Sequence, residues 1–381
     1  MVPEAIQRIN DSMMSKRLYL AIELSQKEWK LGFTIGPGQA PRLRSVTGRN
    51  LAGVMQEIQL AKERFGLEAS SSVLSCYEAG RDGFYLHRYL QSQGVSNRVV
   101  DSASIEVNRR FRRAKTDHLD VGKLLTMLMR YDGGERKVWS VVHVPSAEEE
   151  DRRQLHRELL SLKRDRTHHI NRIKGLLASQ GVVLEVKTDF LAALERVRLW
   201  DGSRLPVGLR SLLEREVERL DLVKQQIHRL EVQRKAAIRN STDPAMEQVR
   251  KLMRLKGIGV NTAWLDVMEF FAWRDFHNRR EVGALAGLTP TPYASGDSTR
   301  EQGISKAGNR PIRALAIEIA WSWLRFQPNS QLSQWYQRRF AKGSSRVRRI
   351  GIVALARKLL IALWRYLETD VPPEGACMID I

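Results

Sequence analysis

Four acidic side chains in the first third of the chain have the chemistry of a metal-dependent phosphodiester site. Glu23 lies in the apolar run LAIEL, Glu78 follows the apolar run LSCY, and Asp117 and Asp120 stand three apart in KTDHLD. Residues three apart project from one face of a helix, and a carboxylate in a buried strand is costly unless it is paired or binds a cation. Four converging carboxylates suit one or two Mg²⁺ ions, which prefer oxygen ligands and bridge to phosphate.

Each of these acids, taken singly, has an ordinary structural explanation. Asp117 can cap the helix that begins there, with Asp120 stabilising the positive end of the same helix. Glu23 can pair with a neighbouring lysine or arginine. Only the set of four, in this order and on these elements, favours metal binding.

The segment 287–310, GLTPTPYASGDSTREQGISKAGNR, is a second candidate for chemistry. It is rich in glycine and serine, carries scattered cations and separates two apolar helical stretches. Connections within compact domains are usually about 4–6 residues long, so a passive loop of this length is uncommon. The segment is predicted to be either a flexible flap or a loop that holds a ligand.

The chain is strongly basic, with 63 lysines and arginines against 43 aspartates and glutamates and a formal net charge of +20. Such a surplus opposes compaction unless a polyanion shares the surface, so nucleic acid is the expected partner and a membrane surface is the rival. Charge runs are commonly solvated faces, but three runs in three regions favour contact with a nucleic-acid backbone, without readout of base sequence. The middle run is residues 163–174. The candidate contacts in the first and last runs are Arg109, Arg110, Arg112, Arg113, Lys115, Arg346, Arg348 and Arg349.

A glycine pair in LKGIGVNTA, residues 255–263, adds a further candidate contact. Gly257 and Gly259 allow a tight turn at a helix start, where backbone N–H groups can hold a phosphate. The stretch resembles a helix-hairpin-helix element, and a simple turn between two helices explains it nearly as well. It is not a dinucleotide fingerprint, because the third glycine is missing and no strand precedes it.

The elements that must position the acids indicate an α/β domain over residues 15–145. Residues 17–35 alternate apolar and polar around a hairpin-like turn, as paired strands do. Helical and strand patterns then alternate up to about residue 131, which predicts a mixed sheet covered by helices.

The rest of the chain is predicted to be helical. Residues 146–245 are charged and helical, and their seam predicts either a coiled coil or one wall of a helical hairpin. The seam would pair either with the helix predicted for QLHRELLSLKRDRTHHINRIKGLL, running antiparallel with residues 202–208 between the two, or with a second subunit. A mostly helical region spans 246–370, and the tail 371–381 is expected to be loose. The seam positions are Leu209, Leu213, Val217, Leu220, Val223, Ile227 and Leu230.

Several classes of protein are excluded by composition. Two cysteines, Cys76 and Cys377, are too few for a disulfide framework or a cysteine-based zinc site. The most apolar stretch, 350–364, is interrupted by Arg357 and Lys358 and is expected to be a buried amphipathic helix and not a membrane span. The N-terminus lacks an apolar signal core, so a cytoplasmic protein is expected.

Taken together, the motifs YEAG, KTDHLD, GIGVNTA, ALAGLTP, ASG, GISKAGN and ALARKLL make this sequence similar to one known family. It resembles the DEDD-type insertion-sequence transposases, which join a RuvC-like (RNase H-like) domain to a serine-bearing transposase domain. Recently described members are bridge-RNA-guided recombinases. The resemblance covers about residues 18–370, and no single motif carries it.

The resemblance implies roles for particular residues. The family's acidic set corresponds to Glu23, Glu78, Asp117 and Asp120, which would bind one or two Mg²⁺ ions at each composite site. Its serine nucleophile corresponds to Ser295, in ASG, although on sequence alone Ser298 or Ser305 could serve. The remaining implied contacts to DNA are Gly296, where the backbone can come close, and Arg300, Lys306 and Arg310, which can hold phosphate oxygens.

One position departs from the family pattern, which usually has aspartate where this chain has Glu23. The additional methylene moves the carboxylate by about one C–C bond, roughly 1.5 Å. The resemblance further implies a noncoding RNA that pairs with target and donor DNA, a dimer or tetramer with composite sites, and a cytoplasmic, nucleoid-associated location in a bacterium or archaeon. Two other hypotheses stay open: a RuvC-like nuclease or junction resolvase without a serine adduct, and an inert nucleic-acid-binding remnant.

Overall fold

The computed structural model describes residues 17–80, 83–105, 117–295 and 298–380, with side chains except at 103, 117–120 and 293–302. The chain forms two compact units, residues 1–144 and 145–381. In the part of the chain that the structure describes, no helix combines the length and the apolar character that crossing a bilayer requires.

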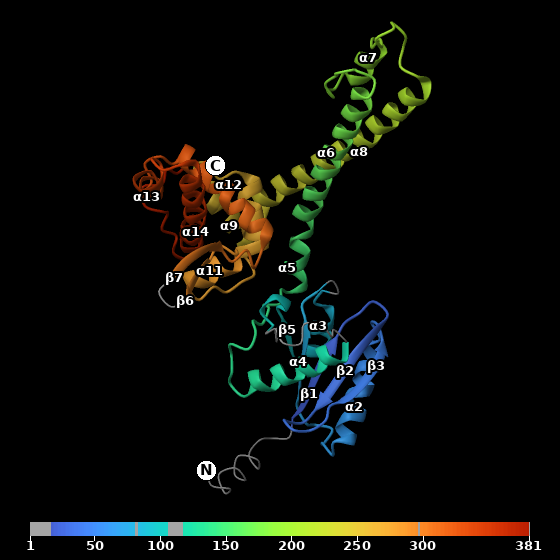
Figure 1. Ribbon diagram of the computed structural model, residues 1–381, viewed down its shortest axis with the longest axis vertical. Helices are drawn as coiled ribbons and strands as arrows, with labels where there is room; N and C mark the ends of the chain where they lie inside the picture. Colours follow the sequence, from blue (N-terminus) through green and yellow to red (C-terminus); the bar gives the residue numbers. More distant parts are fainter. Residues whose placement is uncertain (1–16, 81–82, 106–116, 296–297, 381) are drawn as a thin grey trace. The chain divides into compact units, whose positions relative to one another are not determined.

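The first unit is built on a five-stranded mixed sheet with the strand order β3-β2-β1-β4-β5 (Figure 1). Strands β1 and β2 pair antiparallel, as do β2 and β3, whereas β4 runs parallel to both β1 and β5. The sequence predicted every strand except β3. The strands are β1 Leu18–Glu23, β2 Glu28–Thr34, β3 Arg42–Thr47, β4 Val73–Glu78 and β5 Ser96–Val100.

Alternate residues of the strands face two separate apolar cores. Leu18, Leu20 and Ile22 of β1 pack with α2 (Leu51–Arg64) and α3 (Tyr85–Ser92) on one face. Tyr19 and Ala21 face the opposite side, which is covered by α4 (Asp117–Asp132). A short 3₁₀ turn, η1 (Ser102–Ser104), follows β5. The mixed α/β layering predicted for this region is confirmed.

The second unit begins with a long helical hairpin. After the short helix α5 (Ala147–Arg152), α6 (Gln154–Ala178) packs along α8 (Val207–Asn240). Lys163 pairs with Glu231 and His169 with Glu216, so the partner number falls as the α6 number rises and the helices run antiparallel.

The predicted seam is the contact surface of this hairpin. Five seam residues, Leu213 through Ile227, are buried, and the seam therefore packs against α6 of the same chain. The two helices pair antiparallel, as one of the two predictions had it, but the connection between them is longer than the segment 202–208. The connection spans 179–206 and contains α7 (Phe190–Glu195), whose Phe190 and Leu194 close the end of the core. A coiled coil with a second subunit stays a prediction.

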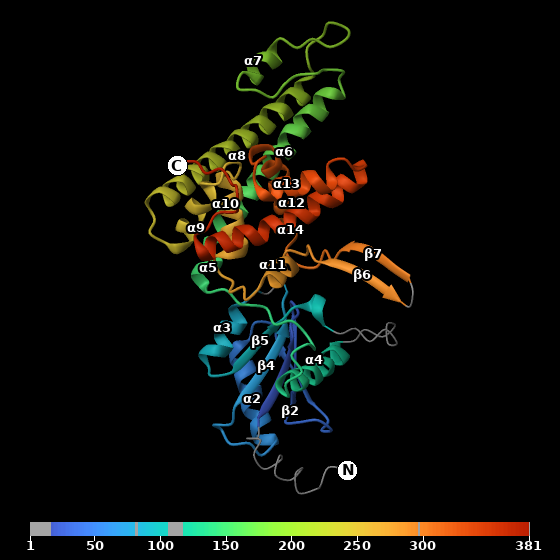
Figure 2. The same ribbon diagram turned by 90° about the vertical axis from the view of Figure 1, so that its left-hand side faces the viewer.

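The helices after the hairpin share one apolar core around α14 (Figure 2). Leu355, Leu359 and Leu363 of α14 are buried in it, as the amphipathic reading of 350–364 predicted. A two-stranded antiparallel hairpin, β6–β7, extends from these helices as an arm. The elements are α9 Pro244–Met253, α10 Val260–Asp266, the π-helix η3 Val267–Phe271, α11 Arg279–Leu285, β6 Pro290–Ser295, β7 Ser298–Ile304, α12 Arg310–Phe326, α13 Gln331–Phe340 and α14 Ser345–Thr369.

The tail was expected to be loose, and the structure shows that residues 374–379 are held by hydrogen bonds. The Gln327 side chain accepts from the Cys377 N–H at 2.6 Å and donates to the Cys377 carbonyl at 2.8 Å. The Ile379 N–H donates to the Arg254 carbonyl at 2.7 Å. Gln327 is 1% exposed, so its amide needs these partners, and the composition of the tail does not reveal that requirement.

Candidate active site

The first two acids lie side by side at one edge of the sheet. In the parallel pair β1–β4, Ile22 is opposite Tyr77, so the next residues, Glu23 and Glu78, are neighbours at the carboxyl ends of both strands. Adjacent strands lie about 4.8 Å apart. By the alternation of the strands, both side chains project on the face that α4 covers, where Glu23 is partly buried and Glu78 is exposed.

The direction of α4 brings the other two acids to the same edge. Asp132, its last residue, accepts hydrogen bonds from the Tyr19 hydroxyl at 2.8 Å and from Arg17 at 2.9 Å, both at the start of β1. Val121 lies over Gly32, where an added Cβ would be 2.3 Å from its Cγ1. The helix therefore runs antiparallel to β1, and its first turn, 117–120, begins at the end of β1 that carries Glu23.

The backbone of Asp117 and Asp120 is thus placed as predicted, in the first turn of a helix, while their side chains lie outside the described residues. Among the side chains that the structure describes, no three acidic, histidine or cysteine residues form a metal-binding group. The four-acid set consists of carboxylate oxygens, which is the donor chemistry that Mg²⁺ prefers.

The acidic edge has an electrostatic effect on its surroundings. Burial raises the pKa of the Cys76 thiol, and the negative charge of Glu78 raises it further. Cys76 stays protonated, and its Sγ lies 3.9 Å from the Leu124 carbonyl in α4. The thiol is therefore a packed apolar group beneath the acids and not a nucleophile.

The segment 287–310 is not the long loop that the sequence suggested. Its central part is the β6–β7 hairpin, in which Tyr293 pairs with Arg300 and Ser295 with Ser298. Ser295 is the last residue of β6. The next two residues, Gly296 and Asp297, lie outside the described residues. A Gly-Asp pair between two extended runs is a hairpin signal, and it could have revealed these strands.

Two glycines of the family motifs close the base of the hairpin. Gly287 (φ +67°) and Gly308 (φ +107°) both adopt left-handed backbone conformations. A Cβ on Gly287 would lie 2.2 Å from the Ala307 carbonyl oxygen, and one on Gly308 would lie 2.3 Å from that of Leu285. No side chain fits at either position, so the motifs ALAGLTP and GISKAGN hold the two ends of the arm together.

Hydrogen bonds complete this junction. The Ser305 N–H donates to the Thr289 carbonyl at 2.8 Å, and the Asn309 N–H donates to the Leu285 carbonyl at 2.8 Å. Arg313 of α12 donates to the Lys306 carbonyl at 2.9 Å. Sequence reasoning missed Arg313, which anchors the base of the arm from a neighbouring helix.

The predicted nucleic-acid contacts have different outcomes. Lys306 and Arg310 are exposed near the base of the hairpin, and Arg300 is in β7 with a side chain that the structure does not describe. Three exposed arginines occupy the start of α14: Arg346, Arg348 and Arg349. The contacts that lie outside the described residues are Arg109, Arg110, Arg112, Arg113, Lys115 and Gly296.

The two glycines of GIGVNTA serve different purposes. Gly257 (φ +94°) packs against α12, where an added Cβ would be 2.9 Å from Phe326, and its carbonyl accepts from the Ser322 hydroxyl at 2.9 Å. Gly259 precedes α10 and faces open space. The geometry agrees with the reading as a turn between helices, and phosphate binding there stays a prediction.

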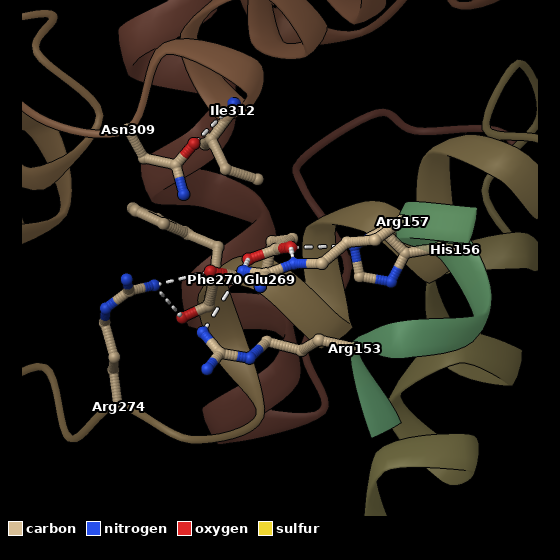
Figure 3. A network of polar contacts seen from close by, with 8 residues as sticks. All are labelled: Arg153, His156, Arg157, Glu269, Phe270, Arg274, Asn309 and Ile312. Carbon is tan, nitrogen blue, oxygen red and sulfur yellow. Dashed lines mark hydrogen bonds and ion pairs between the residues drawn. The ribbon is translucent and has the colours of Figure 1, made fainter. Parts of the chain in front are cut away.

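A charged network joins the helical hairpin to the core of the second unit (Figure 3). Glu269, in the π-helix η3, accepts from His156 at 2.8 Å and from Arg157 at 2.7 Å, both in α6. Burial alone would raise the pKa of Glu269, but these hydrogen bonds outweigh it and lower the pKa to about 2. Arg274 donates to the Glu269 and Phe270 carbonyls. The network fixes the direction in which α6 leaves the core.

Comparison with known proteins identifies the family of this chain. The model for the Transposase IS116/IS110/IS902 family matches residues 249–337, from α9 to α13. A putative transposase, y4rJ, of Sinorhizobium fredii is 40% identical over 376 residues, which cover 95% of this chain and 94% of that protein. The transposase for insertion sequence element IS1328 of Yersinia enterocolitica is 27% identical over 213 residues, 55% of this chain and 60% of that protein. The transposase for IS1111A of Coxiella burnetii is 28% identical over 210 residues, 54% of this chain and 55% of that protein. The chain therefore belongs to the IS116/IS110/IS902 family of insertion-sequence transposases.

Proposed function

We propose that this transposase moves its insertion sequence as a Mg²⁺-dependent serine recombinase. Transposases cut and rejoin DNA, and the strongly basic composition suits that substrate. In the proposal the acids of a RuvC-like first unit and the hairpin arm of the second unit meet at one scissile phosphate. The observation that carries it is the gathering of Glu23, Glu78 and the first turn of α4 at one edge of the sheet.

The covalent step uses Ser295 at the end of β6. Its hydroxyl oxygen bonds to phosphorus, the bond from phosphorus to one deoxyribose oxygen breaks, and the departing strand ends in a hydroxyl that takes up a proton. A phosphoserine ester then links DNA to protein. Attack by another strand's hydroxyl reverses the step, so the bond energy is kept for rejoining. The rigid base of the arm, at Gly287 and Gly308, supports positioning of this serine.

The acids fit a magnesium site in the chemistry of their donors. Glu23, Glu78, Asp117 and Asp120 would hold one or two ions, which would supply charge stabilisation at the phosphate and activation of the serine hydroxyl. Two neighbouring carboxylates repel each other when both are ionised. A divalent cation held at this edge would supply positive charge between the two carboxylates.

Target choice, in the proposal, comes from a structured noncoding RNA of the element, whose loops pair with target and donor DNA. This suits basic surfaces that bind backbone without reading base sequence, a division of labour known in other RNA-guided proteins. A dimer or tetramer would bring the arm of one protomer to the acids of another.

The test is a covalent adduct on a denaturing gel, formed with labelled DNA that carries the element's ends, in the presence of the RNA and Mg²⁺. The proposal expects an adduct with the unmodified chain and with Ser298→Ala as the matched control. Ser295→Ala is expected to abolish it, and Asp117→Ala or Asp120→Ala to reduce it strongly.

The other outcomes identify the rival functions. An adduct that persists in Ser295→Ala refutes the assignment of the nucleophile. Cleavage by the unmodified chain without any adduct indicates a nuclease or junction resolvase that uses metal-activated water. A chain that binds DNA but gains cleavage only with Glu23→Asp is an inert remnant.

A further inference from the structure

The second unit contains a cavity that the proposed chemistry does not use. It measures about 910 Å³ and lies where the base of the β6–β7 arm meets α11, α13 and α14. Pro290, Gly303 and Ile304 contribute the wall from the arm. Sites for molecules of drug size are about 300–1,000 Å³, so a nucleotide fits in this space.

The rim of the cavity is positively charged. Six cations line it, and no acidic residue is among the lining residues whose side chains the structure describes. Among the residues that the structure describes, none of the six forms an ion pair with a carboxylate, so their charge is available to an anion. The six are Arg279, Arg280, Arg346, Arg349, Arg357 and Lys358.

The floor of the cavity is apolar. Leu288 is buried beneath it, and Ile350 of α14, which is 54% exposed, adds an aliphatic surface. Trp335 of α13 adds an aromatic surface, with the Lys358 Nζ 4.8 Å from its ring centroid. An apolar floor below a ring of cations matches a nucleotide, whose base is flat and apolar on its faces and whose phosphates are anionic.

The charged side chains of the described lining are all hydrogen-bond donors. Guanidinium and ammonium groups donate to phosphate oxygens, so the cavity suits a nucleotide of a strand that is held by its phosphates.

The position of the cavity relates it to the cut strand. Pro290 at its wall begins β6, and Ser295 ends it five residues later, a distance of about 17 Å at 3.3–3.4 Å per residue. In duplex DNA each nucleotide of one strand advances about 3.4 Å along the helix axis, so this distance spans at most about five nucleotides of the strand. Bases in a duplex are stacked, so a base must be unpaired and turned out of the stack to enter a cavity of this kind.

We propose that this cavity takes one unpaired deoxynucleotide of the strand cut at Ser295, within about five nucleotides of the scissile phosphate. The base lies against Trp335 and Ile350, and the flanking phosphates lie on Arg280 and Arg349. The arm and the cavity then hold the strand at two points. The inference rests on the proposed serine chemistry for the identity of the strand.

The first experiment is photocrosslinking of the full chain with single-stranded DNA in which 5-iododeoxyuridine replaces one nucleotide at a time. The expected result is a crosslink to Trp335, found by mass spectrometry, at one or two positions within about five nucleotides of the cut site, and loss of that crosslink in Trp335→Leu. Equal crosslinking of fully paired duplex, or crosslinks that avoid Trp335, would overturn the proposal. Stronger crosslinking of single-stranded RNA of the same sequence would overturn the assignment to DNA.

The second experiment measures the salt dependence of binding to single-stranded DNA. Each phosphate contact to a single strand contributes about 0.7 to the slope of log K against log salt. The double variant Arg280→Gln, Arg349→Gln should therefore lower the slope by about 1.4. The matched control Arg229→Gln, Arg239→Gln removes the same charge from exposed positions of α8 and should leave the slope unchanged. Equal losses in the two double variants would show that only net charge acts.

Both measurements work without strand cleavage, so they separate this inference from the proposed function. A crosslink at Trp335 in a chain that forms no serine adduct would support the cavity and reject the serine chemistry. An adduct at Ser295 without any crosslink in the cavity would support the serine chemistry and reject the role of the cavity.

Discussion

Replacing Glu269 by glutamine tests how the helical hairpin is attached to the core of the second unit. The carboxylate accepts from His156 and Arg157 in α6, and Arg153 lies 3.9 Å away. Glu269→Gln keeps the size of the side chain but removes the charge that Arg153, just before α6, and His156 and Arg157 in α6 face. The expected results are a lower free energy of unfolding of the second unit and weaker attachment of α6 to its core.

The magnitude follows from the pKa of this carboxyl. Its fall from 4.5 to about 2 corresponds to about 3 kcal/mol at 1.36 kcal/mol per pKa unit. Arg157 is 46% exposed, and solvent weakens its share. We therefore expect Glu269→Gln to lower the free energy of unfolding by roughly 2–3 kcal/mol at pH 7.

The pH dependence carries the sign of the effect. A carboxyl whose pKa is lower in the folded chain stabilises it fully above pH 4.5, and this contribution disappears as the pH falls towards 2. The difference between the unmodified chain and Glu269→Gln should therefore shrink between pH 5 and pH 2. Urea unfolding followed by tryptophan fluorescence measures it, because seven of the nine tryptophans lie in residues 145–381. A difference that stays constant over this range would refute the reasoning.

Three further predictions concern other parts of the chain. Asp266 is fully buried, and burial raises its pKa to about 8. The folded chain therefore keeps a proton that the unfolded chain loses above about pH 4, so the free energy of unfolding should fall from pH 4 to pH 8. In unfolding measurements Asp266→Asn should remove this pH dependence. Gly287→Ala should displace the arm, since a left-handed non-glycine residue costs about 1–3 kcal/mol and its Cβ would meet a carbonyl oxygen. The rate of amide hydrogen exchange should then rise at 290–304. The control Gly175→Ala, in α6, adds a Cβ that meets no other atom within 4 Å and should leave that rate unchanged. Glu23→Asp should lower the rate of adduct formation by about 10²-fold, because it withdraws the carboxylate by about 1.5 Å; an unchanged rate would remove Glu23 from the site.

Local sequence patterns predicted the first unit well because the central strands of its sheet are either buried on both faces or show a clear alternation of apolar and polar residues. Strand β3 escaped prediction because it is an edge strand in which only Val46 is buried, so its sequence RLRSVT shows no apolar period. The positions of Glu23 and Glu78 at strand ends followed from the apolar runs before them. Their adjacency did not, since it depends on which strands pair and in what register.

The second unit shows what a single sequence hides. Glu269 meets His156 across 113 residues, and nothing in either segment indicates the other. The tail is held by Gln327, about 50 residues earlier, whose amide has no motif. The glycines at 287 and 308 were recognised as parts of motifs, but the reason for them, close approach of two backbone segments at the base of the arm, becomes visible only in three dimensions.

In the proposed recombinase the arm bearing Ser295 and the acids of the first unit would meet at one scissile phosphate. Replacing Mg²⁺ by Fe²⁺ in the assembly with RNA and DNA, then adding peroxide and ascorbate, generates hydroxyl radicals that cut the protein backbone beside the metal. We expect cuts near Glu23 and Glu78 together with cuts in the arm, 290–304. Cuts confined to the first unit, in assemblies that still form the serine adduct, would contradict this proposal.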